Sequence, residues 1–203
     1  MHYTFAMKKE KHYPSFIDGV LNKEFRAGIY EEGMEESWYY VEPGETLASL
    51  PEKLVLVTKD KGYAFDFRSA FGGYIVSERF FSIFEKLSKG PWETAKLEIV
   101  SPKGEQSMAD HYCFIRQRAE HREPIDIIDN TSSVIEYRKT GEIKHISSLA
   151  FKPEVKADIF SIRETTLLGR VFLSAHAAEL FQQANLKGVE IVEAGEVGKV
   201  DRA

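Results

Sequence analysis

One stretch near the end of the chain, residues 158–192, constrains the fold more than any other. It reads DIFSIRETTLLGRVFLSAHAAELFQQANLKGVEIV. Its apolar runs predict three short strands, at 158–162, 169–173 and 189–192. Between the second and third runs, apolar residues at helical spacing predict a helix that begins at Ser174 and ends near Leu186. A serine hydroxyl at the start accepts a hydrogen bond from the first turn, and Gly188 can adopt the left-handed conformation that ends a helix.

The same pattern occurs earlier in the chain, where residues 72–100 read GGYIVSERFFSIFEKLSKGPWETAKLEIV. Four features match in order: Ser77 with Ser174, Phe84 with Phe181, Gly90 with Gly188, and residues 97–100 with 189–192. These ordered matches predict a duplicated strand–helix–strand module whose helices each bury one face on a sheet. The alternative is convergence, because strand, serine, helix, glycine and strand form a common local arrangement.

The rest of the chain consists mainly of short apolar runs with turns between them. This pattern predicts an α+β fold with mixed, largely antiparallel sheets and few helices. Further strands are expected at 54–58, 64–68, 111–118, 125–128, 134–139 and 143–151, with a first strand within residues 1–13. A short helix is expected at 16–22, and a frayed tail after Val192.

A polar connector, residues 101–110, is the best candidate for a boundary within the chain. It predicts an N-terminal subdomain, 1–105, with the first copy of the module, and a C-terminal subdomain, 106–203, with the second copy. One continuous domain is the alternative, since 203 residues are enough for one large domain or two small ones.

Four segments of the C-terminal half, spread over residues 110–195, carry a resemblance to a known family. They are IDIID at 125–129, DIF at 158–160, VFLS at 171–174 and ANLKGVE at 184–190. The order of these segments resembles immunity proteins of bacterial polymorphic toxin systems, of the immunity protein 43 and immunity protein 11 types. Many members have glycine where this chain has Asn185. The resemblance implies a non-enzymatic protein that binds a toxin made by the same cell and neutralises it by occluding its active site.

Charge and cysteine content narrow the range of functions. The net charge of −5 and the pI of about 5.8 argue against a general nucleic-acid binder, which needs a basic excess to neutralise phosphates. The one cysteine, Cys113, excludes an internal disulfide framework and fits a reducing compartment. Residues 1–14 lack the apolar core of a signal peptide, and no apolar run is long enough to span a bilayer. We therefore expect a soluble, cytoplasmic protein with no membrane partner.

The sequence contains no motif for catalysis or for a metal. It has no glycine-rich phosphate loop, His-Glu-x-x-His, paired-cysteine zinc pattern or Gly-x-Ser-x-Gly elbow. His111 and Cys113 would share one face of a strand, next to Asp110, but a single cysteine on an apolar strand favours a small buried hydrophobe. Asp126 and Asp129 would point to opposite faces of a strand, which favours a turn cap over a shared site. No catalytic residue, metal or cofactor is predicted.

Residues 31–45, EEGMEESWYYVEPGE, form an acidic and aromatic segment with six glutamates and no basic residue. Carboxylates steer a basic partner, and tryptophan and tyrosine are frequent anchors of protein interfaces. The candidate toxin-binding residues are Glu31, Glu32, Glu35, Glu36, Trp38, Tyr39 and Tyr40. The alternative is a solvated acidic loop that leads into a strand whose aromatic side chains enter the core. Only the interface interpretation predicts that Trp38 is accessible in the free protein.

Two further interpretations stay open. A small-ligand binder or enzyme would have a cleft between the two copies, where Asp126, His111 and Arg163 are candidates for the lining. A homo-oligomer would pair an edge strand of either copy across a two-fold axis. The first predicts a concave polar pocket, whereas a toxin inhibitor predicts an exposed acidic or aromatic surface.

Overall fold

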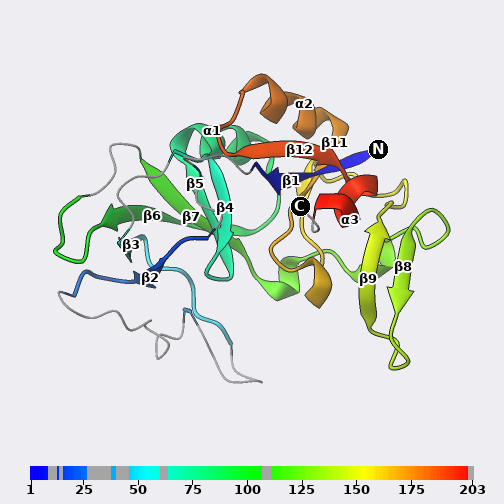
Figure 1. Cartoon of the computed structure of the whole chain (residues 1–203), viewed down its shortest axis with the longest axis horizontal. Helices are drawn as coiled ribbons and strands as arrows, with labels where there is room; N and C mark the ends of the chain where they lie inside the picture. Colours follow the sequence, from blue (N-terminus) through cyan, green and yellow to red (C-terminus); the bar gives the residue numbers. More distant parts are fainter. Residues whose placement is uncertain are drawn as a thin grey trace.

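The computed structural model of the chain describes residues 1–8, 13, 16–26, 38–39, 46–59, 64–106 and 111–200, with residues 199 and 200 described by their backbone alone. It confirms the predicted α+β class (Figure 1). In chain order the strands and α-helices are β1 (His2–Met7), β2 (Gly19–Asn22), β3 (Lys53–Thr58), β4 (Phe67–Ala70), β5 (Gly73–Ser77), α1 (Glu78–Leu87), β6 (Trp92–Val100), β7 (Tyr112–Gln117), β8 (Val134–Tyr137), β9 (Ile143–Ser148), β10 (Ile159–Phe160), β11 (Phe172–Ser174), α2 (Ala175–Gln183), β12 (Val189–Glu193) and α3 (Val197–Val200). Short 3-10 helices lie at Ala119–His121, Ile125–Ile127, Thr165–Leu167 and Ala194–Glu196.

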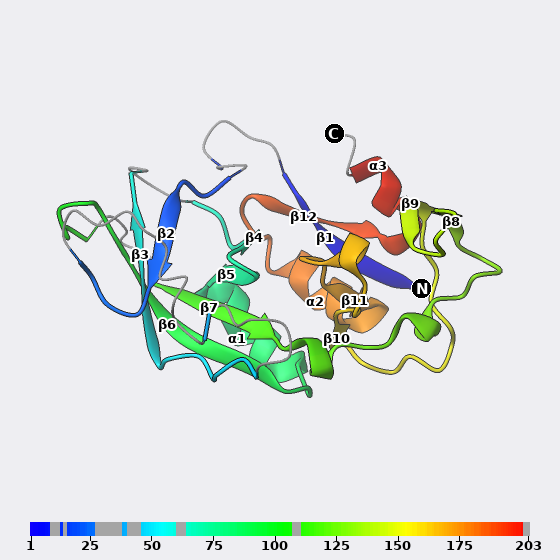
Figure 2. The ribbon, with the colours of Figure 1, turned by 90° about the horizontal axis from the view of Figure 1, so that it is seen from below.

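The strands form three sheets. The six-stranded sheet has the order β2-β3-β6-β7-β5-β4, and only its β3–β6 pair is parallel. The four-stranded sheet has the order β10-β11-β1-β12 and is antiparallel throughout. The β8–β9 hairpin forms the third sheet, with Gly141 at φ +87° in its turn, between the two strands that the sequence predicts. The six-stranded sheet and this hairpin lie at opposite ends of the molecule (Figure 2).

The two copies of the module have the same topology. In the first copy, the hairpin β4–β5 leads into α1 and β6, and β7 lies antiparallel between β5 and β6. In the second copy, β10–β11 leads into α2 and β12, and β1 lies antiparallel between β11 and β12. The central strand follows the first copy in the chain but precedes the second. The shared topology favours duplication over convergence of short local patterns.

Both predicted helix caps are confirmed, and each has a partner that the sequence analysis did not identify. Ser77 Oγ accepts a hydrogen bond from Phe80 N at 3.2 Å and donates one to Asp66 Oδ1 at 2.5 Å. Ser174 Oγ accepts from Ala177 N at 3.1 Å and donates to Asp158 Oδ1 at 2.6 Å. The backbone N–H of each serine also donates to the carbonyl group of the same aspartate. Each module thus links its helix to the start of its hairpin through a serine–aspartate pair.

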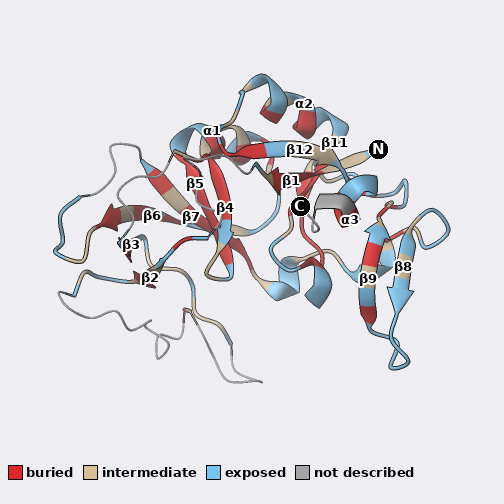
Figure 3. Cartoon of the chain, in the orientation of Figure 1, coloured by how far each residue is buried: buried red, intermediate tan, exposed pale blue. Residues whose placement is uncertain are grey.

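The two modules share one aromatic core. The rings of Phe80 on α1 and Phe181 on α2 stack with their centroids 4.8 Å apart. Phe5 on β1 lies 5.1 Å from Phe181 and 4.7 Å from Phe67 on β4. Phe84 is also fully buried, as its position in the sequence pattern predicts. Buried residues concentrate on the strands of the two larger sheets, whereas β8 is largely exposed (Figure 3).

The sheets do not divide at the predicted boundary near residue 105. β1, from before the boundary, completes the sheet of the second module, and β7, from after it, completes the sheet of the first. Each half of the chain therefore contributes a central strand to a sheet of the other half.

Four local expectations were wrong. Residues 19–22 form β2 rather than part of a helix, because Val20 and Leu21 are buried by pairing with β3. Residues 125–127 form an exposed 3-10 turn instead of a strand. Residues 193–198 are ordered rather than frayed, since Ala194 and Val197 pack in a core cluster with β9. Helix α2 ends at Gln183 rather than near Leu186. Asn185, at φ +50°, is the first residue beyond it in the left-handed conformation, and Gly188 adopts the same conformation at φ +68°.

Candidate functional site

The structure buries Trp38 in the core. The prediction that Trp38 is accessible, which the interface interpretation makes, is therefore wrong. Its side chain is 4% exposed and packs with Ile17, Leu54 and Tyr112 on one face of the six-stranded sheet. Tyr39 is partly buried against the same cluster, with its ring 5.7 Å from that of Trp38. An indole fills this apolar space with a large hydrophobic surface, which accounts for its burial. The other candidates, Glu31, Glu32, Glu35, Glu36 and Tyr40, lie outside the described residues.

Arg116 donates hydrogen bonds to the backbone at two positions, one within the acidic and aromatic segment and one just after it. It lies on β7 and is 6% exposed. Its Nη1 donates a hydrogen bond to the Trp38 carbonyl oxygen, and its Nη2 donates to the Ala48 carbonyl oxygen at 2.7 Å. Because a guanidinium group is planar and rigid, the two bonds hold the two carbonyl groups in a defined relative position.

Glu93 on β6 provides the counter-charge for this anchor. It accepts from Arg116 Nε at 2.6 Å and from Arg118 Nη2 at 2.8 Å, and Arg118 also donates to Ser49 Oγ at 3.2 Å. Burial disfavours ionisation of Glu93, but hydrogen bonds from Arg118 and Arg116 outweigh it and lower the pKa of this carboxyl group. The same contact raises the pKa of Arg118. The network thus stabilises the charged forms of Glu93 and Arg118.

Glu93, Arg116 and Arg118 were not predicted as site residues from the sequence. Arg116 follows the buried residues Phe114 and Ile115, and a charge inside a buried strand is unusual unless it is paired. This unusual position could have identified Arg116 from the sequence. Glu93 could not have been identified in this way, because it lies opposite Arg116 only through the pairing of β6 with β7.

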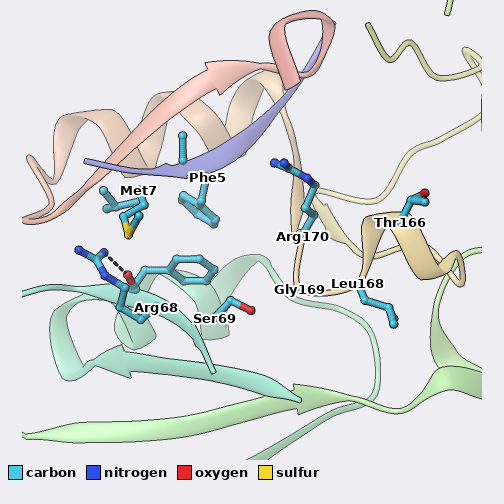
Figure 4. Close-up of a pocket in the computed structure, with 11 residues that line it drawn as sticks. Phe5, Met7, Arg68, Ser69, Thr166, Leu168, Gly169 and Arg170 are labelled. Atoms are coloured by element: carbon cyan, nitrogen blue, oxygen red, sulfur yellow. Dashed lines mark hydrogen bonds between the residues drawn. The ribbon is translucent and has the colours of Figure 1, made fainter. Parts of the chain in front are cut away.

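A cavity of about 350 Å³ lies between the two modules (Figure 4). Strands β1 and β4 and the loop before β11 form most of its wall, and its polar lining comes from Arg68, Ser69, Thr166 and Arg170. The residues expected in a cleft between the copies are elsewhere. His111 lines a second cavity beside Asp66 and Arg79, Asp126 lines a third beside Lys152, and Arg163 lines none of these three.

The other sequence candidates have structural roles. Cys113 is half-buried on β7, and burial, aided by Glu78, raises the pKa of its thiol, which disfavours the nucleophilic thiolate. Asp129 caps its turn, as the sequence predicts. It accepts from Thr131 N at 2.9 Å and Thr131 Oγ1 at 2.6 Å, and hydrogen bonds from Thr131 and Ser132 lower the pKa of its carboxyl group to about 2.

The described residues contain no group of three or more His, Cys, Asp or Glu side chains placed to hold a metal ion. Within the same ranges, no helix has the length and apolar character needed to cross a membrane.

The sequence matches the family model of immunity protein 43 over residues 5–200. The chain belongs to the immunity protein 43 family. The match covers both modules and the β8–β9 hairpin, so membership extends over the N-terminal half, beyond the segments that carried the resemblance. A comparison with curated proteins found no match. The similarity to the immunity protein 11 type stays a prediction. Asn185, the position at which the sequence departs from the pattern of the resemblance, has φ +50°, a left-handed conformation that glycine adopts without strain.

Proposed function

We propose that this protein binds a cognate toxin domain in a stoichiometric complex and neutralises it by occluding its active site. The observation that carries this proposal is the match to the immunity protein 43 family over nearly the whole chain. An inhibitor of this kind acts in the cytoplasm of the producing cell and performs no catalysis of its own. Protection requires tight binding, and a nanomolar dissociation constant corresponds to about −12 kcal/mol.

The acidic and aromatic segment is our proposed docking surface. Glu31, Glu32, Glu35 and Glu36 would steer a basic partner, and Tyr39 and Tyr40 would supply contact area. Trp38 has a different role in this proposal, because its buried indole anchors the segment to the core. The guanidinium group of Arg116 holds the backbone at Trp38 and at Ala48 through hydrogen bonds to their carbonyl oxygens. Anchoring near the segment reduces the conformational entropy that docking would otherwise cost.

The test is co-expression with the toxin domain encoded by the neighbouring gene. We expect this protein to restore growth of a sensitive host and to co-purify with the toxin domain in a one-to-one complex. A catalytically inactive toxin variant serves as the control for binding without toxicity. Toxicity that persists in the presence of this protein, with no complex recovered, would contradict the proposal.

A further inference from the structure

A cavity of about 360 Å³ opens between two segments of the C-terminal half that are joined at both of their ends. Isolated bridges join Glu123 to Ile162 and Ile128 to Phe151. Between the two bridges, the second segment contains more residues than the first, so it cannot run alongside the first over its whole length. The second segment loops outward, and the cavity lies between the two.

The floor of this cavity is apolar. Ile127 lines it from the first segment, and Val155 and Ala157 line it from the second. All three side chains are half-buried and pack against the core cluster that contains Ile146 of β9. Ile125, which is 41% exposed, lies close by in the first segment. The opening leaves room for a large apolar side chain of a partner, which would remove this apolar surface from water.

Five charged side chains form the rim of the cavity. Glu123 and Asp126 belong to the first segment, and Lys152, Glu154 and Lys156 belong to the second. Among the described residues, no side-chain hydrogen bond or ion pair engages any of these five. An apolar floor inside a polar rim is the usual anatomy of a protein interface. A partner would fill the floor with an apolar group and pair its own charges with the rim.

The cavity is within reach of a partner that docks on the acidic and aromatic segment. Arg118 donates a hydrogen bond at 3.2 Å to Ser49 Oγ, shortly after that segment. From Arg118 the chain continues through the 3-10 helix Ala119–His121 to Glu123, a stretch that spans at most about 18 Å (Figure 2). A standard interface buries about 800 Å² on each partner, which corresponds to roughly 30 Å across. One partner domain can therefore contact both places.

We propose that this cavity is a second contact site for the toxin domain, and that it receives an apolar side chain flanked by a basic and an acidic group. The basic group would pair with Glu123 and Asp126, and the acidic group with Lys152 and Lys156. This inference rests on the proposed function and adds the chemistry of the toxin segment. Because the rim carries charges of both signs, the cavity should contribute little to long-range steering and act mainly on the lifetime of the complex.

Filling the cavity tests this inference. Ala157→Leu places a larger side chain in it, and Ala184→Leu, at the half-buried C-cap of α2, is the matched control. In surface-based kinetics with a catalytically inactive toxin domain, Ala157→Leu should raise the dissociation rate roughly tenfold or more and change the association rate less than about threefold. Ala184→Leu should change neither rate. Equal dissociation rates for both variants would overturn this inference alone, whereas no complex with the unsubstituted protein would overturn the proposed function as well.

Methyl NMR of the unsubstituted protein adds a test that does not depend on a variant's folding. Binding of the inactive toxin domain should shift the δ1 methyl signal of Ile127 but not that of Ile75, which is 0% exposed within the six-stranded sheet. A complex in which the Ile127 signal stays unmoved would refute the assignment. The alternative occupant is a second copy of this chain. Light scattering that shows a dimer of the free protein, which Ala157→Leu converts into a monomer, would also refute the assignment to the toxin.

Discussion

The rings of Phe80 and Phe181 stack at 4.8 Å and an interplanar angle of 30°, and this contact joins the two helices of the duplicated module. Phe80 lies three residues after its capping serine and Phe181 lies seven after its own, so the contact does not pair equivalent positions of the repeat. The modules therefore meet through different turns of their helices, and both depend on the same aromatic core.

Truncation of this core should be costly. We expect Phe181→Ala and Phe84→Ala each to lower the free energy of unfolding by about 3–5 kcal/mol, because each leaves a cavity among buried rings. Urea denaturation of the two variants measures this. Phe16→Ala, at a side chain that is 77% exposed, is the matched control and should change stability by less than about 0.5 kcal/mol. Urea denaturation curves of the two core variants that match the curve of the unsubstituted protein would contradict this packing.

The serine caps make a smaller contribution. Ser174→Ala should cost about 1 kcal/mol, the usual value for a lost helix cap. Ser77→Ala should cost more, up to about 2 kcal/mol, because its partner Asp66 is buried and would lose a hydrogen bond. Urea titrations of both variants give the two values. A larger cost at Ser174 than at Ser77 would be inconsistent with the role assigned to Asp66.

Stability should depend on pH through Glu93. Its pKa is lower in the folded state than in the unfolded chain, so the stabilisation is present above the unfolded-state pKa and is lost as pH falls through the folded-state pKa. The free energy of unfolding, measured from pH 7 to pH 3, should fall less steeply for Glu93→Gln. Glu85→Gln, on the exposed side of α1, serves as the control and should keep the slope of the unsubstituted protein. Identical slopes for all three proteins would exclude Glu93 as a source of the acid sensitivity.

Removing the guanidinium group of Arg116 should make the Trp38 side chain accessible to water. We expect Arg116→Met to lower the free energy of unfolding by about 3–5 kcal/mol, since it leaves the charge of Glu93 without one of its two partners and removes hydrogen bonds to two carbonyl groups. In a Trp92→Phe background, the fluorescence of Trp38 should shift to longer wavelength as water reaches the indole. An emission maximum that stays at the value of the Trp92→Phe parent would show that Trp38 is held without Arg116.

Charge reversal in the acidic segment tests the proposed docking surface. Replacing Glu31, Glu32, Glu35 and Glu36 with lysine should slow association with the toxin domain roughly tenfold or more at low salt and weaken its salt dependence. Stopped-flow or surface-based kinetics measure both effects. The control is the same reversal at four exposed glutamates elsewhere, namely Glu142, Glu179, Glu190 and Glu193. Equal slowing by both sets of substitutions would show that the effect comes from the net charge alone.

Local features of this protein were predictable because they depend on neighbouring residues. Ser77 and Ser174 cap helices through bonds within one turn, and Phe84 and Phe181 are buried because helical periodicity places them on the apolar face. The turn at Gly141 likewise follows from residues on either side of it. Such interactions span a few residues, so the sequence determines them with little regard to the rest of the chain.

Contacts between distant segments were decided only by the tertiary structure. The sequence alone does not show that β1 inserts between β11 and β12, or that β7 brings Arg116 opposite Glu93, because register is set by the partner strand. The same holds for Trp38, whose residue type suits an interface and a core equally well until the sheet beneath it is known. The sequence by itself determined the helices, their caps and the repeat, since these form through short-range bonds. The tertiary structure decided which side chains meet, because each of those contacts depends on long-range strand pairing.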